Sequence, residues 1–139
     1  MTAPPRIVHR LRIDARADRA ALIAGLRAPR AAIAPKYFYD AAGCARFAAI
    51  CELPEYYPTR TEQAIFAVHR AAIAAAVGEG KQLVDLGAGD CRKAASWFAA
   101  LRPARYLAVD IAAGEISEAL TALAATHPGI ELTGIVADF

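Results

Sequence analysis

Residues 83–93 read Leu83-Val84-Asp85-Leu86-Gly87-Ala88-Gly89-Asp90-Cys91-Arg92-Lys93. A short apolar run ends in a Gly-x-Gly turn, and a helix-forming stretch follows the turn directly. Gly87 and Gly89 allow the backbone to turn sharply and to approach a ligand closely. The helix that follows offers its unpaired N–H groups at the same place. The pattern therefore predicts a strand, a ligand-binding turn and a helix.

Downstream of this turn, strand and helix patterns alternate along the chain. We expect strands at 82–86, 105–111 and 130–137, a helix at 92–101, and a helix at 114–126 that Pro128 ends. Strands joined by crossover helices pair in parallel with right-handed connections, which predicts half of a doubly wound α/β sheet. Such a sheet takes helices on both faces and further strands beside its first one. We therefore expect a fragment without its C-terminal remainder, which leaves an apolar edge open.

The first part of the chain has a different pattern and predicts an N-terminal helical segment over residues 1–60, with the α/β part in residues 61–139. Its first thirty residues are rich in arginine, which is typical of a solvated helix. Asp14 can cap a helix that runs to about Arg27, and Asp40 can cap a second helix.

Two proline-bounded stretches of this segment concentrate tyrosine: Pro35-Lys36-Tyr37-Phe38-Tyr39-Asp40 and Leu53-Pro54-Glu55-Tyr56-Tyr57-Pro58-Thr59-Arg60-Thr61-Glu62. Buried tyrosine hydroxyls need partners, and loops that gather tyrosines often face a ligand, so a substrate role and a core role are both open. Thr59 and Glu62 have the spacing of a capping box, which predicts a helix that begins there and ends at Gly78.

Polar or aromatic residues end the second and third predicted strands. Asp110 follows Gly89 by about 20 residues, the distance at which a carboxylate can accept the hydroxyls of a ribose. Asp138 and Phe139 end the third strand and offer a polar acceptor and an aromatic ring to a purine. The carboxyl ends of parallel strands meet at one sheet edge, where open α/β sheets bind ligands. The alternative is that the two aspartates only cap helices or turns.

Composition excludes several classes of function. The chain has 139 residues, 16 basic and 14 acidic side chains, and a net charge of +2. Its arginines are spread out and are not aligned with aromatic residues, so we expect neither a nucleic acid nor a membrane as partner. No apolar run reaches the roughly 18 residues that span a bilayer, and the start lacks a secretory signal, which predicts a cytoplasmic protein. Three cysteines without CxxC spacing and three scattered histidines predict no disulfide framework and no metal site.

The residues around the glycine turn distinguish between nucleotides. A dinucleotide fingerprint needs a glycine three positions after Gly89, where this chain has Arg92. Asp85, an acid just before the turn, resembles motif I of the S-adenosylmethionine-dependent methyltransferases. That cofactor carries a cationic sulfonium and an amino-acid end, to which acidic groups are suited. An NAD(P)-dependent oxidoreductase and a non-catalytic binding module stay open as alternatives.

The two tyrosine-rich stretches, taken together with the glycine turn and Lys93, resemble the histidine-specific methyltransferase family. The resemblance implies the first half of a Rossmann-like class I methyltransferase sheet. It also implies the activity of that family, which trimethylates the α-amino group of L-histidine to hercynine in the first step of ergothioneine biosynthesis. The family's inserted domain, which reads the imidazole ring, is absent from this chain.

The same resemblance implies roles for individual residues. Gly87, Lys93, Asp110, Asp138 and Phe139 would bind S-adenosylmethionine, with Lys93 at its methionine carboxylate and Asp110 at its ribose. Tyr56 would hold the amino-acid substrate, and Tyr39 would lie near the substrate's amino group. No catalytic nucleophile is needed. The chain departs from the family pattern at three positions, where it has Asp90, Cys91 and Ala112.

The resemblance and the predicted truncation also lead to expectations for the molecule as a whole. We expect the full-length protein to be a monomer. The 139 residues by themselves should be inactive and poorly soluble, because acceptor groups and sheet partners are missing.

Overall fold

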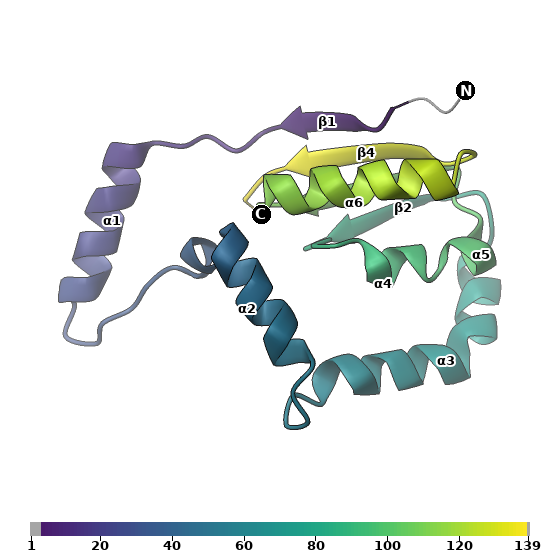
Figure 1. The fold of residues 1–139 in the computed structure, drawn as a ribbon, viewed down its shortest axis with the longest axis horizontal. Coiled ribbons are helices and arrows are strands. Elements are labelled where there is room, and N and C mark those ends of the chain that lie inside the picture. The colour runs from purple at the N-terminus through teal and green to yellow at the C-terminus, as the bar shows by residue number, and fades with distance from the viewer. Residues whose placement is uncertain (1–3, 139) are drawn as a thin grey trace.

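The computed structural model describes residues 4–138, in which a four-stranded sheet is combined with helices (Figure 1). The strands are β1 (Arg6–His9), β2 (Gln82–Leu86), β3 (Arg105–Asp110) and β4 (Glu131–Val136). They lie in the order β1-β4-β3-β2, and all neighbours pair in parallel. The crossovers hold α4 (Arg92–Ala95), α5 (Phe98–Leu101) and α6 (Ala113–Thr126). The predicted β-α-β-α-β half-sheet is confirmed, as part of a Rossmann-like α/β fold.

The core lies between one face of the sheet and the crossover helices. Tyr106 of β3 and Leu132 of β4 are buried on this face, and Ile116 and Leu120 of α6 are fully buried against it. Burial of each large apolar side chain contributes about 1.5–3 kcal/mol. A Cβ at Gly134 of β4 would lie 2.5 Å from a methyl carbon of Ile116, so glycine lets α6 sit directly on the strand.

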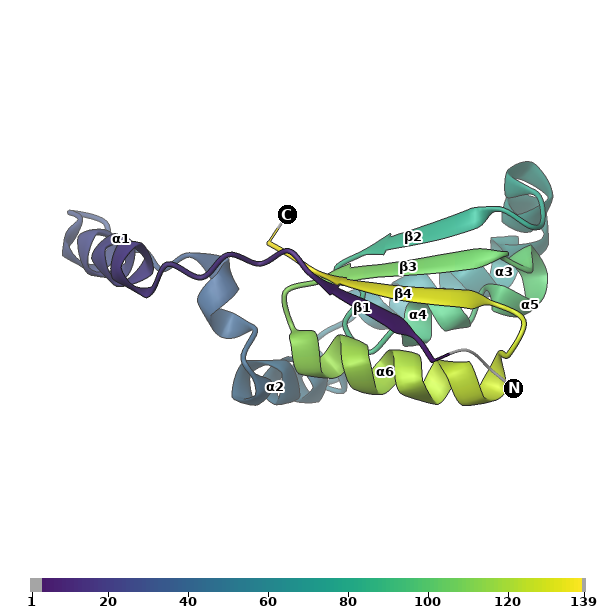
Figure 2. The ribbon, with the colours of Figure 1, turned by 90° about the horizontal axis from the view of Figure 1, so that it is seen from above.

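The opposite face of the sheet is bare in the part of the chain that the structure describes. Figure 2 shows α4, α5 and α6 on one side of the strands and no helix over the other side. Val84 and Leu86 of β2 point to this uncovered side and are 49% and 64% exposed. Because β2 is also an edge strand, its main-chain groups lack a partner on one side. The predicted open apolar edge is therefore confirmed.

The first crossover departs from the prediction of one helix over 92–101. The structure has two short helices, with Ser96 and Trp97 between them. The Ser96 hydroxyl donates a hydrogen bond to the Lys93 carbonyl at 2.7 Å and so competes for the main-chain bonds of the helix. The Trp97 ring packs against Phe66, with 5.0 Å between ring centroids. The hydrophobic periodicity of the sequence does not predict these side-chain interactions.

Strand β1 is the element that the sequence pattern did not predict. It lies within the segment expected to be helical and pairs in parallel with β4, from Arg6 opposite Thr133 to His9 opposite Val136. After it, the N–H groups of Arg10 and Leu11 both donate to the Val136 carbonyl, at 2.8 and 2.9 Å. Four residues are too few to show a clear alternation, and the strand is stabilised by the β4 ladder that it joins.

The N-terminal helices begin where their predicted caps lie. The Asp14 carboxylate accepts the N–H groups of residues 16 and 17 before α1 (Ala15–Arg27), and Asp40 accepts the Gly43 N–H before α2 (Ala41–Cys51). A short 3-10 helix, η1 (Pro35–Phe38), connects them. In Figure 1 the strand arrowheads point toward the side of the molecule that holds α1 and α2. The first tyrosine-rich stretch lies at the carboxyl end of the sheet, because Lys36 and Tyr37 line a cavity together with Ile111 and Asp138. The second stretch includes the connection from α2 to the next helix, at the end of α2 that lies away from the sheet in Figure 1.

The predicted capping box at Thr59 and Glu62 does not form. Helix α3 (Pro58–Val77) begins one residue earlier, and its N-cap Tyr57 makes no side-chain hydrogen bond to the helix. Pro58 explains the shift, because its fixed φ and missing N–H suit the first helical position. Glu62 is free to face another partner, and Gly78 ends the helix with a φ of 82° as predicted.

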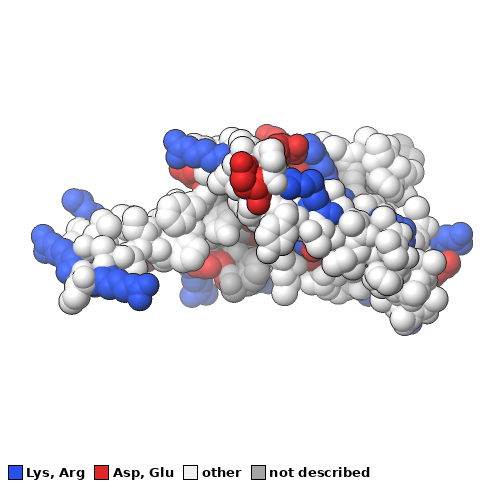
Figure 3. Space-filling view, turned by 90° about the horizontal axis from the view of Figure 1, so that it is seen from below, with Lys and Arg blue, Asp and Glu red and all other residues white. Residues whose placement is uncertain are grey.

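Charge is scattered over the surface. On the face that Figure 3 shows, acidic and basic side chains mix over the middle of the molecule, and basic ones gather at the α1 end. Helix α1 carries Arg16, Arg19 and Arg27. Among the described residues, no helix is both long and apolar enough to cross a membrane.

Candidate functional site

The glycine turn is held against the end of the neighbouring strand. Gly87 and Gly89 have φ values of 75° and 50°, a region that glycine adopts without steric cost. The N–H groups of Gly87 and Ala88 both donate to the Val109 carbonyl, at 2.9 and 3.1 Å. The turn therefore lies at the carboxyl end of β3, where the sequence placed the ligand site.

Asp110 connects this turn to the loop after β3. Its side chain is nearly buried, Oδ2 accepts the Gly89 N–H at 2.8 Å, and Oδ1 accepts the Ala112 N–H at 2.9 Å. Hydrogen bonds from two loops fix the orientation of the carboxylate. A carboxylate oxygen can accept more than one hydrogen bond, so each oxygen keeps acceptor capacity toward a ligand. The turn-capping role that the sequence left open is therefore present, and it leaves room for a ribose role.

Asp85 has a different partner, which the sequence analysis missed. The Tyr106 hydroxyl donates a hydrogen bond to Oδ2 of Asp85 at 3.0 Å. Tyr106 is fully buried and packs edge-on against Phe98, with 5.2 Å between ring centroids. A tyrosine inside an otherwise apolar buried strand was the available signal, because its hydroxyl must find a partner.

Cys91 is the strained residue of the turn. It has a φ of 59°, in the left-handed region that few non-glycine residues adopt, and its side chain is fully buried. Burial raises the pKa of its thiol, so the thiol stays protonated and packs as a small apolar group. The departure at this position thus lies inside the core, away from the ligand side of the turn.

Lys93 lies in the first turn of α4 and faces helix α3. Its ammonium nitrogen is 3.7 Å from Oε1 of Glu62, and both side chains are about half exposed. Glu62 belongs to the second tyrosine-rich stretch, so this ion pair joins that stretch to the glycine turn. An exposed pair of this kind contributes little to stability, about 0–1 kcal/mol, and leaves Lys93 available to another carboxylate.

Asp138 lies beside a cavity of about 370 Å³ at the carboxyl end of β3 and β4. The cavity is lined by residues of the sheet end and of the N-terminal segment: Arg10, Leu11, Arg12, Ile13, Asp18, Lys36, Tyr37, Ile111 and Asp138. Lys36 pairs with Asp18 at 2.7 Å, and this hydrogen bond raises the pKa of Lys36. Phe139, the other residue predicted at this position, lies outside the described residues.

The two candidate substrate tyrosines, Tyr56 and Tyr39, lie in different loops and have different neighbours. Tyr56 is half-buried, and its ring packs edge-on against Phe47 of α2 with 6.1 Å between centroids. Tyr39 follows η1 and is 50% exposed. Within residues 4–138, the rings of Tyr39 and Tyr56 make no contact with each other. Burial and the negative charges of Glu115 and Asp110 raise the pKa of Cys44 in α2.

Arg60 holds the loop that carries Tyr56. Its guanidinium donates to the Leu53 carbonyl at 2.9 Å and also to the Pro54 carbonyl. Charge-assisted hydrogen bonds of this kind are stronger than neutral ones, and the planar fork reaches two acceptors at once. The sequence analysis gave Arg60 no role, because its partners are main-chain atoms of a loop.

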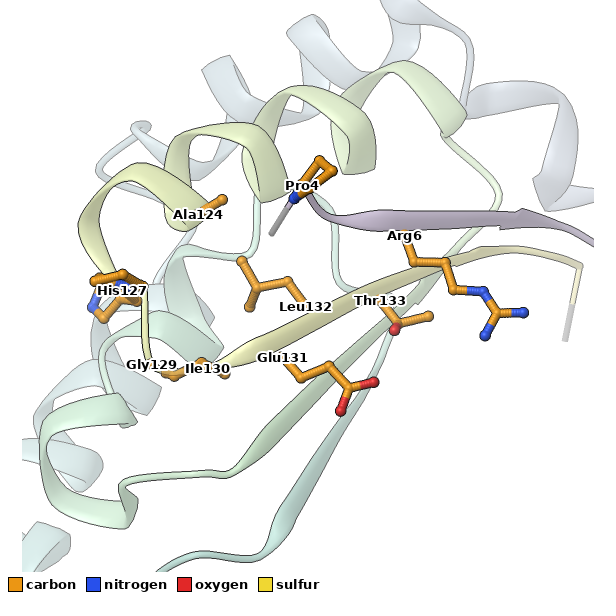
Figure 4. A pocket seen from close by; sticks show the side chains of 10 residues that line it. Pro4, Arg6, Ala124, His127, Gly129, Ile130, Glu131, Leu132 and Thr133 are labelled. Carbon is orange, nitrogen blue, oxygen red and sulfur yellow. The ribbon is translucent and has the colours of Figure 1, made fainter. Parts of the chain in front are cut away.

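A second cavity, of about 410 Å³, lies at the amino end of β4 (Figure 4). Figure 4 shows Pro4 and Arg6 from the β1 side and His127 and Ile130 from the connection between α6 and β4 around it. None of the candidate site residues lines this cavity. The candidate residues at the carboxyl ends of the strands therefore do not belong to this cavity.

The family of this chain follows from its similarity to known proteins. Residues 18–139 match the model of a family described as histidine-specific, SAM-dependent methyltransferases. The chain belongs to this family. The match includes both tyrosine-rich stretches, the glycine turn and the ends of β3 and β4. It supports neither the oxidoreductase alternative nor the non-catalytic one.

Named relatives agree with the family assignment. The chain is 42% identical over 120 residues to a histidine N-alpha-methyltransferase of Mycolicibacterium smegmatis and 35% identical over 119 residues to one of Mycobacterium tuberculosis. These alignments cover 84% and 83% of this chain and 37% of each relative. An N-methyltransferase of Aspergillus fumigatus, fsqC, is 32% identical over 95% of this chain and 39% of its own length. The chain thus spans less than two fifths of the length of these relatives.

The family to which the chain belongs is described as SAM-dependent. Among the described residues, no group of three or more His, Cys, Asp or Glu side chains could hold a metal ion. The polar groups around the glycine turn include the carboxylates of Asp85 and Asp110, the Lys93 ammonium and main-chain N–H groups, a set that suits an organic cofactor with both positive and negative charges.

Proposed function

We propose that the complete protein transfers methyl groups from S-adenosylmethionine to the α-amino group of an amino acid, with L-histidine as acceptor and hercynine as product. The observation that carries this proposal is the glycine turn bonded to Asp110 at 2.8 Å, in a member of the family named above. The names of the two mycobacterial relatives support histidine as the acceptor. The reaction would be the first step of ergothioneine biosynthesis.

The described residues fit the proposed cofactor part by part. Gly87 and Gly89 leave the backbone open to close approach, and Asp110 offers acceptor capacity to ribose hydroxyls. Asp138 would face the purine across the cavity of about 370 Å³. The proposal that Phe139 lies beside the purine rests on the family resemblance. Lys93 would pair with the methionine carboxylate.

The acidic side of the site fits the positive end of the cofactor. Asp85 lies next to the glycine turn and makes one hydrogen bond, to a neutral tyrosine, so its charge is not cancelled by a cation. Coulomb attraction between unit charges at 4 Å is about 4 kcal/mol at the effective dielectric constant of a protein surface. A phosphate-bearing dinucleotide would be repelled by the same carboxylate.

S-adenosylmethionine, when bound, supplies an activated methyl group to an amine nitrogen. The chain contributes by alignment and by exclusion of water, which are the main sources of rate for such a transfer. The rings of Tyr39 and Tyr56 would stabilise the positive charge that builds up on the substrate nitrogen, at about 0.5–2 kcal/mol for each cation–π contact. Tyr56 would also hold the amino-acid substrate, and no side chain is needed as a nucleophile.

Binding and turnover measured on the complete protein test this proposal. Calorimetry should show binding of S-adenosylhomocysteine and no binding of NAD. Incubation with S-adenosylmethionine and L-histidine should give mono-, di- and trimethylated products by mass spectrometry, with other amino acids as controls. Binding of NAD alone, or methylation of another amine in place of L-histidine, would contradict the proposal. Cytoplasmic location and a monomeric state also remain proposals, which cell fractionation and sedimentation can test.

A further inference from the structure

Asp110 and Asp85, the two aspartates next to the glycine turn, are held by different kinds of hydrogen bond. Both oxygens of Asp110 accept main-chain N–H groups. Asp85 accepts one side-chain bond, from Tyr106 to Oδ2. Within residues 4–138, Oδ1 of Asp85 accepts no hydrogen bond, and no lysine, arginine or histidine pairs with this carboxylate. Within the described residues, Asp85 therefore has one oxygen held by Tyr106 and one oxygen left for a ligand.

Tyr106 is placed so that its hydroxyl cannot follow Asp85 if the carboxylate rotates. The residue pairs with Leu83 in the β2–β3 register, which sets it two residues from Asp85 on the same covered face. Its ring is fully buried and packs against Phe98, which also packs edge-on against the His127 ring with 5.1 Å between centroids. Burial also raises the pKa of the Tyr106 hydroxyl, so it stays a neutral donor.

A neutral, fixed donor has a specific effect on a carboxylate. It restrains rotation about the side chain and directs the second oxygen to one place, and it leaves the negative charge intact. An arginine or lysine partner would orient the group equally well but would cancel that charge toward an incoming cation. The arrangement therefore suits recognition of positive charge at the glycine turn.

We propose that Tyr106 is a positioning residue, which aims the Asp85 carboxylate at the positively charged methionine part of the cofactor. This inference rests on the proposed function, since it assumes that S-adenosylmethionine binds at the turn. The contrasting role is purely structural, in which Asp85 only satisfies a buried hydroxyl. The two roles differ in which part of the cofactor loses affinity when the hydrogen bond is removed.

The test compares two probes by calorimetry on the complete protein. S-adenosylhomocysteine carries the amino-acid part with its ammonium, and 5′-methylthioadenosine lacks it. Tyr106→Phe keeps the packed ring and removes the hydroxyl, so we expect about tenfold weaker binding of S-adenosylhomocysteine. Binding of 5′-methylthioadenosine should change by less than about twofold. Tyr57→Phe, which removes a hydroxyl from a residue that is 68% exposed, should change neither probe.

Changes at Asp85 provide the second measurement and do not depend on whether the tyrosine variant folds. Asp85→Asn should show the same selective loss, and adding Tyr106→Phe to it should cause no further loss, because the hydroxyl acts through the carboxylate. Asp85→Glu keeps the charge and displaces it by one methylene, so it too should weaken only S-adenosylhomocysteine. Circular dichroism melts establish that each variant is folded.

The outcomes separate this inference from the proposed function. If the wild-type protein binds S-adenosylhomocysteine and the Tyr106 or Asp85 variants weaken both probes equally, or weaken neither, the inference is overturned and the proposed function stands. If the wild-type protein binds neither probe, the proposed function fails and the inference fails with it. Selective loss at both residues establishes Tyr106 as the positioning residue.

Discussion

Residues in and around the glycine turn have structural roles that precede any contact with a ligand. Asp110 links two loops through its two oxygens, and Cys91 packs inside the turn in a left-handed conformation. A substitution at Asp110 is therefore expected to act on folding and on the proposed site together, whereas one at Cys91 acts mainly on folding. Separating these effects requires measurements of stability and of binding on the same variant.

Asp110→Asn tests the link between the two loops. The amide places one N–H₂ group against a main-chain N–H of Gly89 or Ala112, so one hydrogen bond becomes a donor–donor contact. We expect a loss of about 1–3 kcal/mol in the free energy of unfolding, measured by urea denaturation, and weaker S-adenosylhomocysteine binding. Asp90→Asn, at an exposed position, is the matched control. Lower stability with unchanged affinity would reduce Asp110 to a purely structural role.

Cys91 tests how the turn tolerates backbone strain. A β-branched side chain at a φ of 59° is strongly disfavoured, and extra volume at a fully buried position adds a steric cost. Cys91→Val should therefore lower the free energy of unfolding by about 2 kcal/mol or more. Cys51→Val in helix α2, where the backbone is relaxed, should cost clearly less by the same measurement. Equal costs at the two positions would argue against strain at Cys91.

Tyr56→Phe tests the proposed substrate contact. Loss of the hydroxyl should weaken L-histidine binding by about tenfold and leave S-adenosylhomocysteine affinity unchanged, because the ring packing on Phe47 is retained. Calorimetric titration of each ligand into the complete protein measures both. Tyr57→Phe is the neighbouring control and should change neither affinity. An equal loss for the two ligands would reject the role assigned to Tyr56.

At the scale of elements, the start of α3 joins the two halves of the proposed site. Arg60 holds the loop before Tyr56, and two residues later Glu62 faces Lys93 at the glycine turn. The failed capping box explains this arrangement, because Pro58 begins the helix and the Glu62 side chain is not needed at its N-terminus. The second tyrosine-rich stretch and the glycine turn, the two parts of the proposed site, are thus both in contact with the start of α3.

Arg60→Ala tests this support. Without the guanidinium the carbonyls of Leu53 and Pro54 lose their shared donor, and the loop gains freedom. We expect the KM for L-histidine to rise about tenfold with S-adenosylhomocysteine affinity unchanged. Arg60→Lys, which can reach one carbonyl at a time, should lie between wild type and alanine. Arg46→Ala on the exposed side of α2 is the control, and a similar rise in KM there would contradict a specific role for Arg60.

At the scale of the whole molecule, the uncovered face of the sheet dominates the behaviour of these 139 residues. Val84 and Leu86 lie on an edge strand and expose large apolar side chains. Helices cover the other face, so one face of the sheet is packed against helices and the opposite face is uncovered (Figure 2). Exposed apolar edge strands favour association between molecules.

Dye binding and light scattering test this property on the 139-residue chain. We expect it to bind the hydrophobic dye ANS and to scatter light increasingly with concentration. Leu86→Lys should reduce both signals, because the charge lies on the uncovered side, where Leu86 is 64% exposed. Val68→Lys on α3, at a side chain that is 76% exposed, is the control and should change them little. Equal reduction by both lysines would point to net charge as the cause.

Local signals predicted the elements with clear patterns, and nonlocal pairing decided the rest. Strand β2 has the predicted bounds, and the caps at Asp14 and Asp40 are confirmed, since a cap needs only neighbouring main-chain groups. The predicted helix over 92–101 is wrong in detail, because Ser96 bonds back to the helix and Trp97 packs on a distant ring. The glycine turn and its aspartates were predicted as a site, whereas Tyr106 and Arg60 were not.

The amino-acid sequence by itself determined the order of strands and helices around the glycine turn, and the residues that gather at the carboxyl edge of the sheet. Only the tertiary structure decided that β1 joins β4, that Tyr106 bonds Asp85, and that one sheet face stays uncovered. The physical reason is the separation along the chain of the residues that interact. Turns and caps are set by contacts within a few residues, whereas strand register and side-chain partners depend on segments far apart along the chain that meet only in the folded protein.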